Sequence, residues 1–363
     1  MRIADLLDQL RTLGAGPAHQ QRVLRHWAQA ASLDRGAHAP EHFYPKALLE
    51  ALPGLRAALA GLARLHTSHP GDDGSARLLV ALHDGQMVES VLLPVGAKGG
   101  GVCVSTQVGC AVGCRFCMTG QGGLVRQLGS AEIVAQVVLA RQQRPALRHG
   151  VRRVVFMGMG EPAHNLDEVL DAIELLGTAG NIGHKELVFS TVGDARVFER
   201  LLGPQAGRVK PALALSLHTT KPALRAELLP RAPALTPAEL VALGETYAQA
   251  TGYPIQFQWT LLEGVNDGDD ELEGIARLLA GKRAMMNLIP FNSVEGTGYR
   301  RPSWERAAEM ARWLNRRGVL TRLRRSAGQD VDAGCGQLRA RAERPARGQA
   351  GSARRVIGIA PAA

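Results

Sequence analysis

The chain has 363 residues, 45% of them hydrophobic, which is enough to bury the core of one large α/β domain with a smaller part attached. Its 42 Gly and 19 Pro show neither the period of collagen nor the low hydrophobicity of a disordered chain. The formal net charge is +10, and only 6 of the 43 basic residues are Lys, which favours RNA or another phosphate-bearing partner. With only 7 Phe, 4 Tyr and 4 Trp, base stacking on aromatic side chains is excluded as the main means of recognition.

The cysteines and the first residues bear on the compartment. There are five cysteines, an odd number that argues against the disulfide framework of a small secreted protein. Asp5 and Asp8 interrupt the stretch where a signal peptide has its apolar core, and no run approaches the ~18 apolar residues of a membrane span. We therefore expect a cytoplasmic protein with no membrane partner.

The first part of the chain has a helical pattern. From Ile3 to about Arg64, leucines and other apolar residues recur at spacings of three and four. Two runs typical of strands follow, at 76–82 and 87–93, with a hairpin turn at Asp84-Gly85. We predict a small helical domain over residues 1–70 and a linking β-hairpin over 71–95.

Beyond residue 95, strand and helix patterns alternate. The predicted strands are 102–108, 153–158, 187–192, 211–217, 255–262 and 284–290. The predicted helices are 130–142, 165–177, 194–202, 221–250 with a break at Pro230, 269–280 and 304–317. Six βα units in series predict a parallel sheet, either doubly wound or an incomplete barrel, over residues 96–330. A C-terminal part, 331–363, holds Cys335 and a basic tail with six Arg after that cysteine.

Glycine-rich and polar motifs follow the predicted strands. They are the three-cysteine loop, Gly158-Met-Gly-Glu-Pro162, Ser190-Thr191, Ser216-Leu217-His218 and Pro290-Phe-Asn292. In parallel α/β folds the carboxyl ends of the strands form the active face. These separate segments are therefore expected to meet at one site.

The three-cysteine loop reads Cys110-Ala-Val-Gly-Cys114-Arg-Phe-Cys117. Three thiolates at this spacing can bind three irons of a [4Fe–4S] cluster and leave the fourth iron without a protein ligand. Structural zinc is less well supported because no second Cys/His pair lies at a matching spacing. Three metal-free buried cysteines and a thioredoxin-like redox pair remain weaker alternatives.

The C-x3-C-x2-C motif, with Phe116 before its last cysteine, resembles the signature of the radical S-adenosylmethionine (radical SAM) superfamily. Cys103, Cys335, the Gly158–Pro162 and Ser216–His218 motifs and Asn287-Leu-Ile-Pro-Phe-Asn292 extend this likeness. Together they are similar to the RlmN/Cfr family of ribosomal RNA adenine methyltransferases, over residues 85–340.

The resemblance implies a partial (β/α)6 barrel with a [4Fe–4S] cluster and S-adenosylmethionine as cofactors. By this likeness the cluster ligands are Cys110, Cys114 and Cys117. The residues implied for S-adenosylmethionine binding are Gly160, Glu161, Ser190, Ser216, Leu217, His218 and Asn292. Two groups of arginines are candidate phosphate contacts: the pair Arg152-Arg153, and Arg322, Arg324 and Arg325.

The resemblance also implies a reaction sequence. Cys335 would receive a methyl group, a 5′-deoxyadenosyl radical would take a hydrogen atom from it, and the methylene radical would add to the base. Cys103 would then release the RNA by attacking Cys335 in a transient disulfide, and Glu89 would accept the proton of the base carbon.

The same likeness implies the substrate and the partners. The implied substrate is an adenosine of 23S rRNA, methylated at carbon 2 or alternatively at carbon 8, with tRNA as a second substrate. The implied partner is an electron donor such as flavodoxin or ferredoxin, and no binding of DNA is expected. Met118, Leu124-Val125 and Gln329-Asp330 depart from the better-known members, which leaves the carbon and the RNA open. The alternatives are a radical enzyme for a peptide or small metabolite, and a non-enzymatic iron–sulfur RNA-binding protein.

Overall fold

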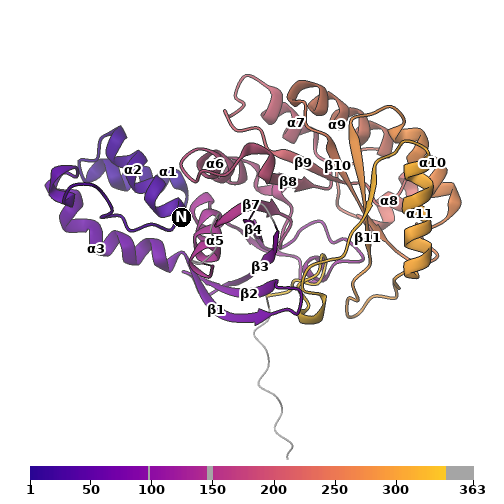
Figure 1. Ribbon diagram of the computed structural model, residues 1–363, viewed down its shortest axis with the longest axis horizontal. Helices are drawn as coiled ribbons and strands as arrows, with labels where there is room; N and C mark the ends of the chain where they lie inside the picture. Colours follow the sequence, from indigo (N-terminus) through magenta and orange to yellow (C-terminus); the bar gives the residue numbers. More distant parts are fainter. Residues whose placement is uncertain (97–98, 145–149, 341–363) are drawn as a thin grey trace, which may run out of the picture.

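The computed structural model describes residues 1–96, 99–144 and 150–340. Its N-terminal helices are α1 (Ile3–Thr12), α2 (Pro17–Ala28) and α3 (Lys46–Gly61), and the short 3₁₀ helix η1 (Pro40–His42) lies in the connection between α2 and α3. They form a unit at one side of the molecule (Figure 1). The apolar face of each helix carries leucines that are almost completely buried, such as Leu6, Leu10 and Leu48, which is how an amphipathic surface helix gains stability.

A ten-stranded sheet forms the centre of the molecule. In spatial order its strands are β1 (Ala63–Pro70), β2 (Ala76–Leu82), β3 (Met87–Gly96), β4 (Gly99–Cys103), β7 (Val151–Phe156), β8 (Leu187–Thr191), β9 (Ala212–Ser216), β10 (Ile255–Leu261), β11 (Ala284–Pro290) and β12 (Thr321–Leu323). The pairs from β1 to β4 are antiparallel, and all pairs from β4 to β12 are parallel. Within the described residues the outer strands β1 and β12 do not pair, so the parallel part is an incomplete barrel.

Helices connect the parallel strands, as the alternation predicts. They are α5 (Ser130–Gln142), α6 (Leu166–Gly177), α7 (Ala195–Leu202), α8 (Pro222–Leu228), α9 (Pro237–Thr251), α10 (Asp269–Leu279) and α11 (Trp304–Arg316). Short 3₁₀ turns are η2 (Pro162–Asn165), η3 (His184–Glu186) and η4 (Gln329–Val331). Every helix predicted beyond residue 95 is present, and the break predicted at Pro230 separates α8 from α9.

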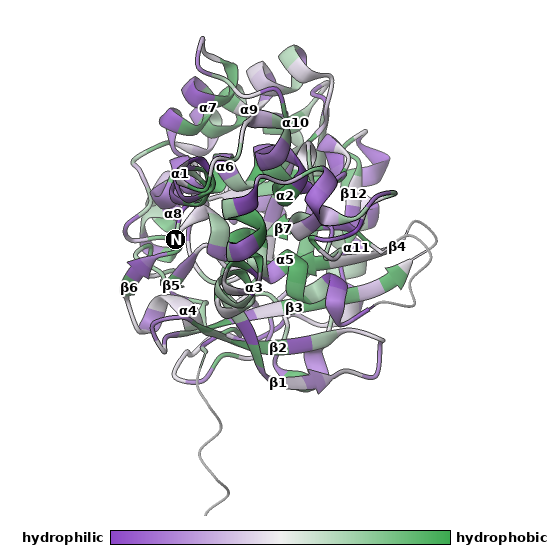
Figure 2. Cartoon of the chain, turned by 90° about the vertical axis from the view of Figure 1, so that its left-hand side faces the viewer, coloured by the Kyte–Doolittle hydropathy of each residue, from purple (hydrophilic) through white to green (hydrophobic). Residues whose placement is uncertain are grey.

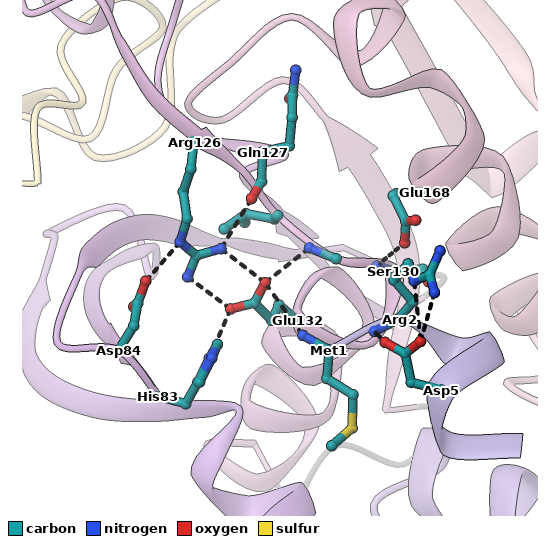
Figure 3. A network of polar contacts seen from close by, with 12 residues as sticks. Met1, Arg2, Asp5, His83, Asp84, Arg126, Gln127, Ser130, Glu132 and Glu168 are labelled. Atoms are coloured by element: carbon teal, nitrogen blue, oxygen red, sulfur yellow. Dashed lines mark hydrogen bonds and ion pairs between the residues drawn. The ribbon is translucent and has the colours of Figure 1, made fainter. Parts of the chain in front are cut away.

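Helix α5 joins the N-terminal helices to the sheet. It is buried from Ser130 to Ala140, as expected of a helix covered on both faces, and most of these residues are apolar; in Figure 2 it is largely green at the centre of the molecule. At its start, the backbone N–H of Ile3 donates to Ser130 Oγ, and the Glu132 carboxylate accepts from Arg126 and from the Gly129 N–H (Figure 3). This buried network fixes the small helical unit against the larger domain.

Two details differ from the sequence prediction. Residues 63–70 form strand β1, whereas the sequence predicts a helical domain over residues 1–70. This strand is mostly exposed and polar, so it lacks the alternation that marks a half-buried strand. The run 102–108 is not one strand: β4 ends at Cys103, and β5 (Gln107–Gly109) pairs with β6 (Leu124–Gln127) in a separate two-stranded sheet. Between them, the Val104 N–H donates to the carbonyl of Val155, and the Gly158 N–H donates to the carbonyl of Val104.

None of the helices within the described ranges combines the length and the apolar composition needed to cross a membrane.

Candidate functional site

A cavity of about 160 Å³ lies where five parallel strands end. Phe156 of β7, Ser190 of β8, Ser216 of β9, Thr260 of β10 and Ile289 of β11 all line it. Cys110, Cys114 and Cys117 line the same cavity, between β5 and the short helix α4 (Met118–Gln121). The predicted meeting of segments at the carboxyl ends of the strands is therefore found.

The three cysteines suit a cluster with several irons. Burial raises the pKa of Cys110 to about 12 and that of Cys114 well above its usual range, with a further rise from the neighbouring cysteines. All five cysteines are free thiols in the structure. Among the described residues no three His, Cys, Asp or Glu side chains converge closely enough to hold a single metal ion. A [4Fe–4S] cluster makes no such demand, because each thiolate binds a different iron.

Gly160 and Glu161 form a tight turn against β5. Gly160 has φ +104, and a Cβ there would lie 2.6 Å from the Cβ of Gln107, so only glycine fits. The Gln107 carbonyl oxygen Oε1 in turn accepts from the Glu161 N–H at 2.8 Å. The Glu161 carboxylate is buried and accepts from the N–H groups of Ala163 and Val192, and burial raises its pKa. A buried carboxylate beside the cysteines is a suitable acceptor for the ammonium group of a methionine.

His218 also lines this cavity, with Ser190 and Ser216. Its Nδ1 accepts a hydrogen bond from the Thr260 N–H at 3.0 Å, which places the ring proton on Nε2. Burial lowers the pKa of His218 to about 3, so the ring is neutral. Its edge-to-face contact with Phe116, at 4.9 Å between ring centroids, ties it to the cluster loop.

Two residues expected at the cofactor do not line the cavity. Leu217 is completely buried and belongs to the main core. Asn292 instead holds the Cys335 loop: its Nδ2 donates to the Cys335 carbonyl at 3.1 Å and to Ser326 Oγ at 2.9 Å, while its Oδ1 accepts from Gln329 and Arg301. Its proposed contact with the cofactor gains no support from this geometry.

A second, larger cavity of about 640 Å³ adjoins the first. Cys117, Met157, Gln258, Cys335 and Gly336 are among the residues that line both. The larger cavity has a cationic lining, made of Arg153, Lys185, Arg322, Arg324 and Arg325. At its rim, the Arg325 guanidinium lies 5.0 Å from the ring centroid of Trp304, which is 43% exposed.

Cys103 and Cys335 both line the larger cavity. Cys103 ends β4 and is buried, which raises the pKa of its thiol. Cys335 is exposed, but its exposed surface faces the two cavities, and the protein around it also raises the pKa of its thiol. The disulfide expected between these two cysteines is not formed in the structure.

Glu89 lies apart from both cavities. Its side chain is 1% exposed; Oε1 accepts from Arg77 Nη1 at 2.6 Å, and Oε2 accepts from the backbone N–H of Arg339 at 2.7 Å. Val91, two residues further along the same face of β3, does line the larger cavity. Glu89 therefore shares the face of the site without reaching it.

Some residues at the site escaped the sequence analysis. Gln256, Gln258 and Thr260 alternate with buried apolar residues along β10, and Gln258 and Thr260 line the smaller cavity. That alternation of polar residues in a buried strand could have identified them. Arg225 is 4% exposed and its guanidinium donates to the carbonyls of Val192, Ser216 and Leu235. Nothing in its sequence context marks it.

The family description of the Radical SAM superfamily matches residues 104–279. The chain belongs to this superfamily. Membership implies a [4Fe–4S] cluster and S-adenosylmethionine as cofactors. The donor set fits them, with three cysteine sulfurs for the cluster and Glu161, Ser190, Ser216 and His218 for the polar groups of S-adenosylmethionine.

Relatives cover nearly the whole chain. A protein of Methylibium petroleiphilum named "Probable RNA methyltransferase" is 71% identical over 94% of this chain and 94% of its own length. One of the same name from Aromatoleum aromaticum is 70% identical over 94% and 93%. The crystal structure of a radical SAM methyltransferase from Sphaerobacter thermophilus superimposes with a TM-score of 0.78 at 35% identity, covering 94% of this chain and 98% of that one. The chain therefore belongs to the same family as these two relatives and the Sphaerobacter protein.

Proposed function

We propose that the protein is an RNA methyltransferase of the RlmN/Cfr type, which methylates a ring carbon of an adenosine through a methyl group carried on Cys335. The observation that carries this proposal is that Cys335 lines both cavities, one with the cluster cysteines and one with Cys103 and five cationic side chains. The names of the relatives support RNA as the substrate.

The larger cavity has the chemistry that such a substrate needs. Five cations suit phosphates, which position RNA without reading its sequence. The amides of Gln256 and Gln258 offer both donors and acceptors to a base edge. We propose 23S rRNA as the substrate, with tRNA as a second one, and carbon 2 rather than carbon 8 as the position methylated. A flavodoxin or ferredoxin as electron donor and a cytoplasmic location belong to the same proposal.

Carbons 2 and 8 of adenine are electron-poor, so neither attacks the methyl group of a sulfonium directly. When bound, the cluster and S-adenosylmethionine supply the methyl group and the radical chemistry that overcomes this. Cys110, Cys114 and Cys117 would hold the cluster, and Glu161, Ser190, Ser216 and His218 would hold the nucleoside and amino-acid parts.

The remaining steps are proposed for the side chains of Cys335, Cys103 and Glu89. Cys335 carries the methyl carbon and becomes bonded to the base through it. The Cys103 thiolate then attacks the Cys335 sulfur and a disulfide forms; the bond between that sulfur and carbon breaks, and its electron pair stays on carbon, which takes up a proton to become the methyl group of the base. The adduct gives up one electron as the ring carbon loses its own proton, and the acceptor for that electron would be the cluster, when bound. Glu89 is proposed to accept the proton of the ring carbon, which requires its present contacts with Arg77 and Arg339 to open.

The test is mass spectrometry of Cys335. Protein purified without oxygen, loaded with cluster and supplied with S-adenosylmethionine should carry a methyl group on Cys335, and the Cys335→Ala variant should carry none on any cysteine. Unmodified Cys335 in cluster-loaded protein would contradict the proposal and favour direct radical chemistry on a peptide or small metabolite.

A further inference from the structure

Residues 328–340, here called the Cys335 segment, are fastened to the rest of the molecule at many points. Gly328 N–H donates to Asp73 in the turn between β1 and β2, at 3.1 Å. Met118 N–H and Thr119 Oγ1, next to the cluster loop, donate to the carbonyls of Gly336 and Leu338 at 2.7 and 2.6 Å. The position of the thiol thus depends on contacts made by its backbone.

One pair of side chains holds both flanks of the thiol. Arg77 Nε donates to the carbonyl of Val331 at 2.7 Å, and Glu89 accepts from the N–H of Arg339 at 2.7 Å. Val331 and Arg339 each lie four residues from Cys335, one on either side. The two side chains are joined to one another by the ion pair at 2.6 Å. A single unit therefore spans the base of the loop that presents Cys335.

We propose that Arg77 and Glu89 act as a clasp that positions the Cys335 segment, and that the antiparallel strands β2 and β3 serve to carry this clasp. This role rests on the proposed function, because it is Cys335 that the segment presents to the two cavities. This proposal gives β2 and β3 a function in the site, whereas the sequence predicts them only as a hairpin that links two domains. In this role both act as positioning residues, and neither lines either of the two cavities. For Glu89 the role belongs to the state with its contacts to Arg77 and Arg339 closed, before the step in which it is proposed to accept a proton.

The chemistry of the pair suits a clasp. A guanidinium has several N–H donors in a fixed plane, so Arg77 can bind the Val331 carbonyl and the Glu89 carboxylate at once. The carboxylate has two oxygens, one for Arg77 and one for Arg339. Glu89 is buried and the Arg77 side chain is only 13% exposed, so water competes little for these bonds, and hydrogen bonds to charged groups are stronger than neutral ones.

The test compares hydrogen exchange in the full-length protein, followed by mass spectrometry of its peptides. Removing one charge alone would leave the other buried and unpaired and could unfold the sheet. The double variant Arg77→Met/Glu89→Leu instead replaces both charges with apolar groups. Arg208→Met is the control, since it breaks a solvent-exposed ion pair with Glu174. Neither residue of that pair contacts the Cys335 segment in any of the bonds described.

We expect amide exchange in peptides within residues 328–340 to accelerate by about tenfold or more in the double variant. Peptides from β7, β8 and β9 should exchange as in the unmodified protein, and the control should match it throughout. Unchanged exchange in the Cys335 segment would overturn the proposal, and so would an equal acceleration across the whole sheet, which indicates loss of general stability.

A second readout separates the clasp from the proposed chemistry. The double variant, loaded with cluster and supplied with S-adenosylmethionine, should acquire less methyl on Cys335 than the control in the same time. If the unmodified protein acquires none, the proposed function fails, while the exchange experiment still decides whether the clasp exists.

Discussion

At the scale of single residues, both the backbone and the side chain of His218 are constrained. Its φ is +61, in the left-handed region that non-glycine residues seldom adopt, and its ring is held by Thr260 and Phe116. Asn is among the residues that tolerate this backbone region best. The variant His218→Asn therefore removes the imidazole with little backbone strain.

His218→Asn should change how stability depends on pH. Burial lowers the pKa of His218 from 6.5 to about 3, so between these values the unfolded chain binds a proton that the folded protein excludes. The free energy of unfolding thus falls as pH falls below about 6.5, by up to about 1.4 kcal/mol per pH unit. Denaturant titrations at pH 7, 6 and 5 should show a smaller loss in the variant. Parallel losses in both proteins would contradict the assignment.

Most of the predicted site residues that line the smaller cavity were selected because they follow a strand. The three cluster cysteines, Gly160 and His218 are of this kind, because strand ends are visible in the apolar pattern. The contacts of Glu89 and Asn292 were not predictable in this way. Glu89 meets Arg339 across 250 positions, and Asn292 meets Cys335 across 43, so their partners depend on how the chain folds back.

At the scale of elements, Arg225 links the ends of β8 and β9. Its guanidinium supplies hydrogen bonds to the carbonyls of Val192 and Ser216, and to Leu235 before α9. Burial lowers the pKa of this arginine, so its charge is costly and is tolerated only because these carbonyls surround it.

Arg225→Met should therefore lower the free energy of unfolding by about 3 kcal/mol, since it leaves buried carbonyls unpaired. Urea denaturation measures this loss. The matched control Arg208→Met, which affects an exposed ion pair, should lose less than about 1 kcal/mol. Equal losses in the two variants would show that Arg225 does not hold the strand ends together.

The helices after residue 95 were predictable because each has a local apolar pattern and clear ends. Thr236 illustrates this: its side chain accepts from the Glu239 N–H, and the Glu239 side chain accepts from Thr236, a capping box that is visible in the sequence. Strand β1 has no such signal. It is ordered by pairing with β2, which no local pattern reveals.

At the scale of the whole molecule, the net charge of +10 is partly concentrated where the proposed substrate would bind. Arg153, predicted as a phosphate contact, and the three arginines from 322 to 325 line the larger cavity, together with Lys185. The basic tail is outside the described residues except for Arg339, whose N–H binds Glu89. The cationic cavity and the smaller cavity meet at Cys335, so the proposed RNA contacts and the proposed methyl transfer would share this thiol.

The most direct test of this account is the Cys103→Ala variant, loaded with cluster and given S-adenosylmethionine and ribosomal RNA without oxygen. With no thiol to attack Cys335, the RNA should stay covalently bonded to the protein through Cys335, visible as a crosslinked species on a denaturing gel and absent from Cys103→Ala/Cys335→Ala. Release of free, methylated RNA by Cys103→Ala would contradict the account.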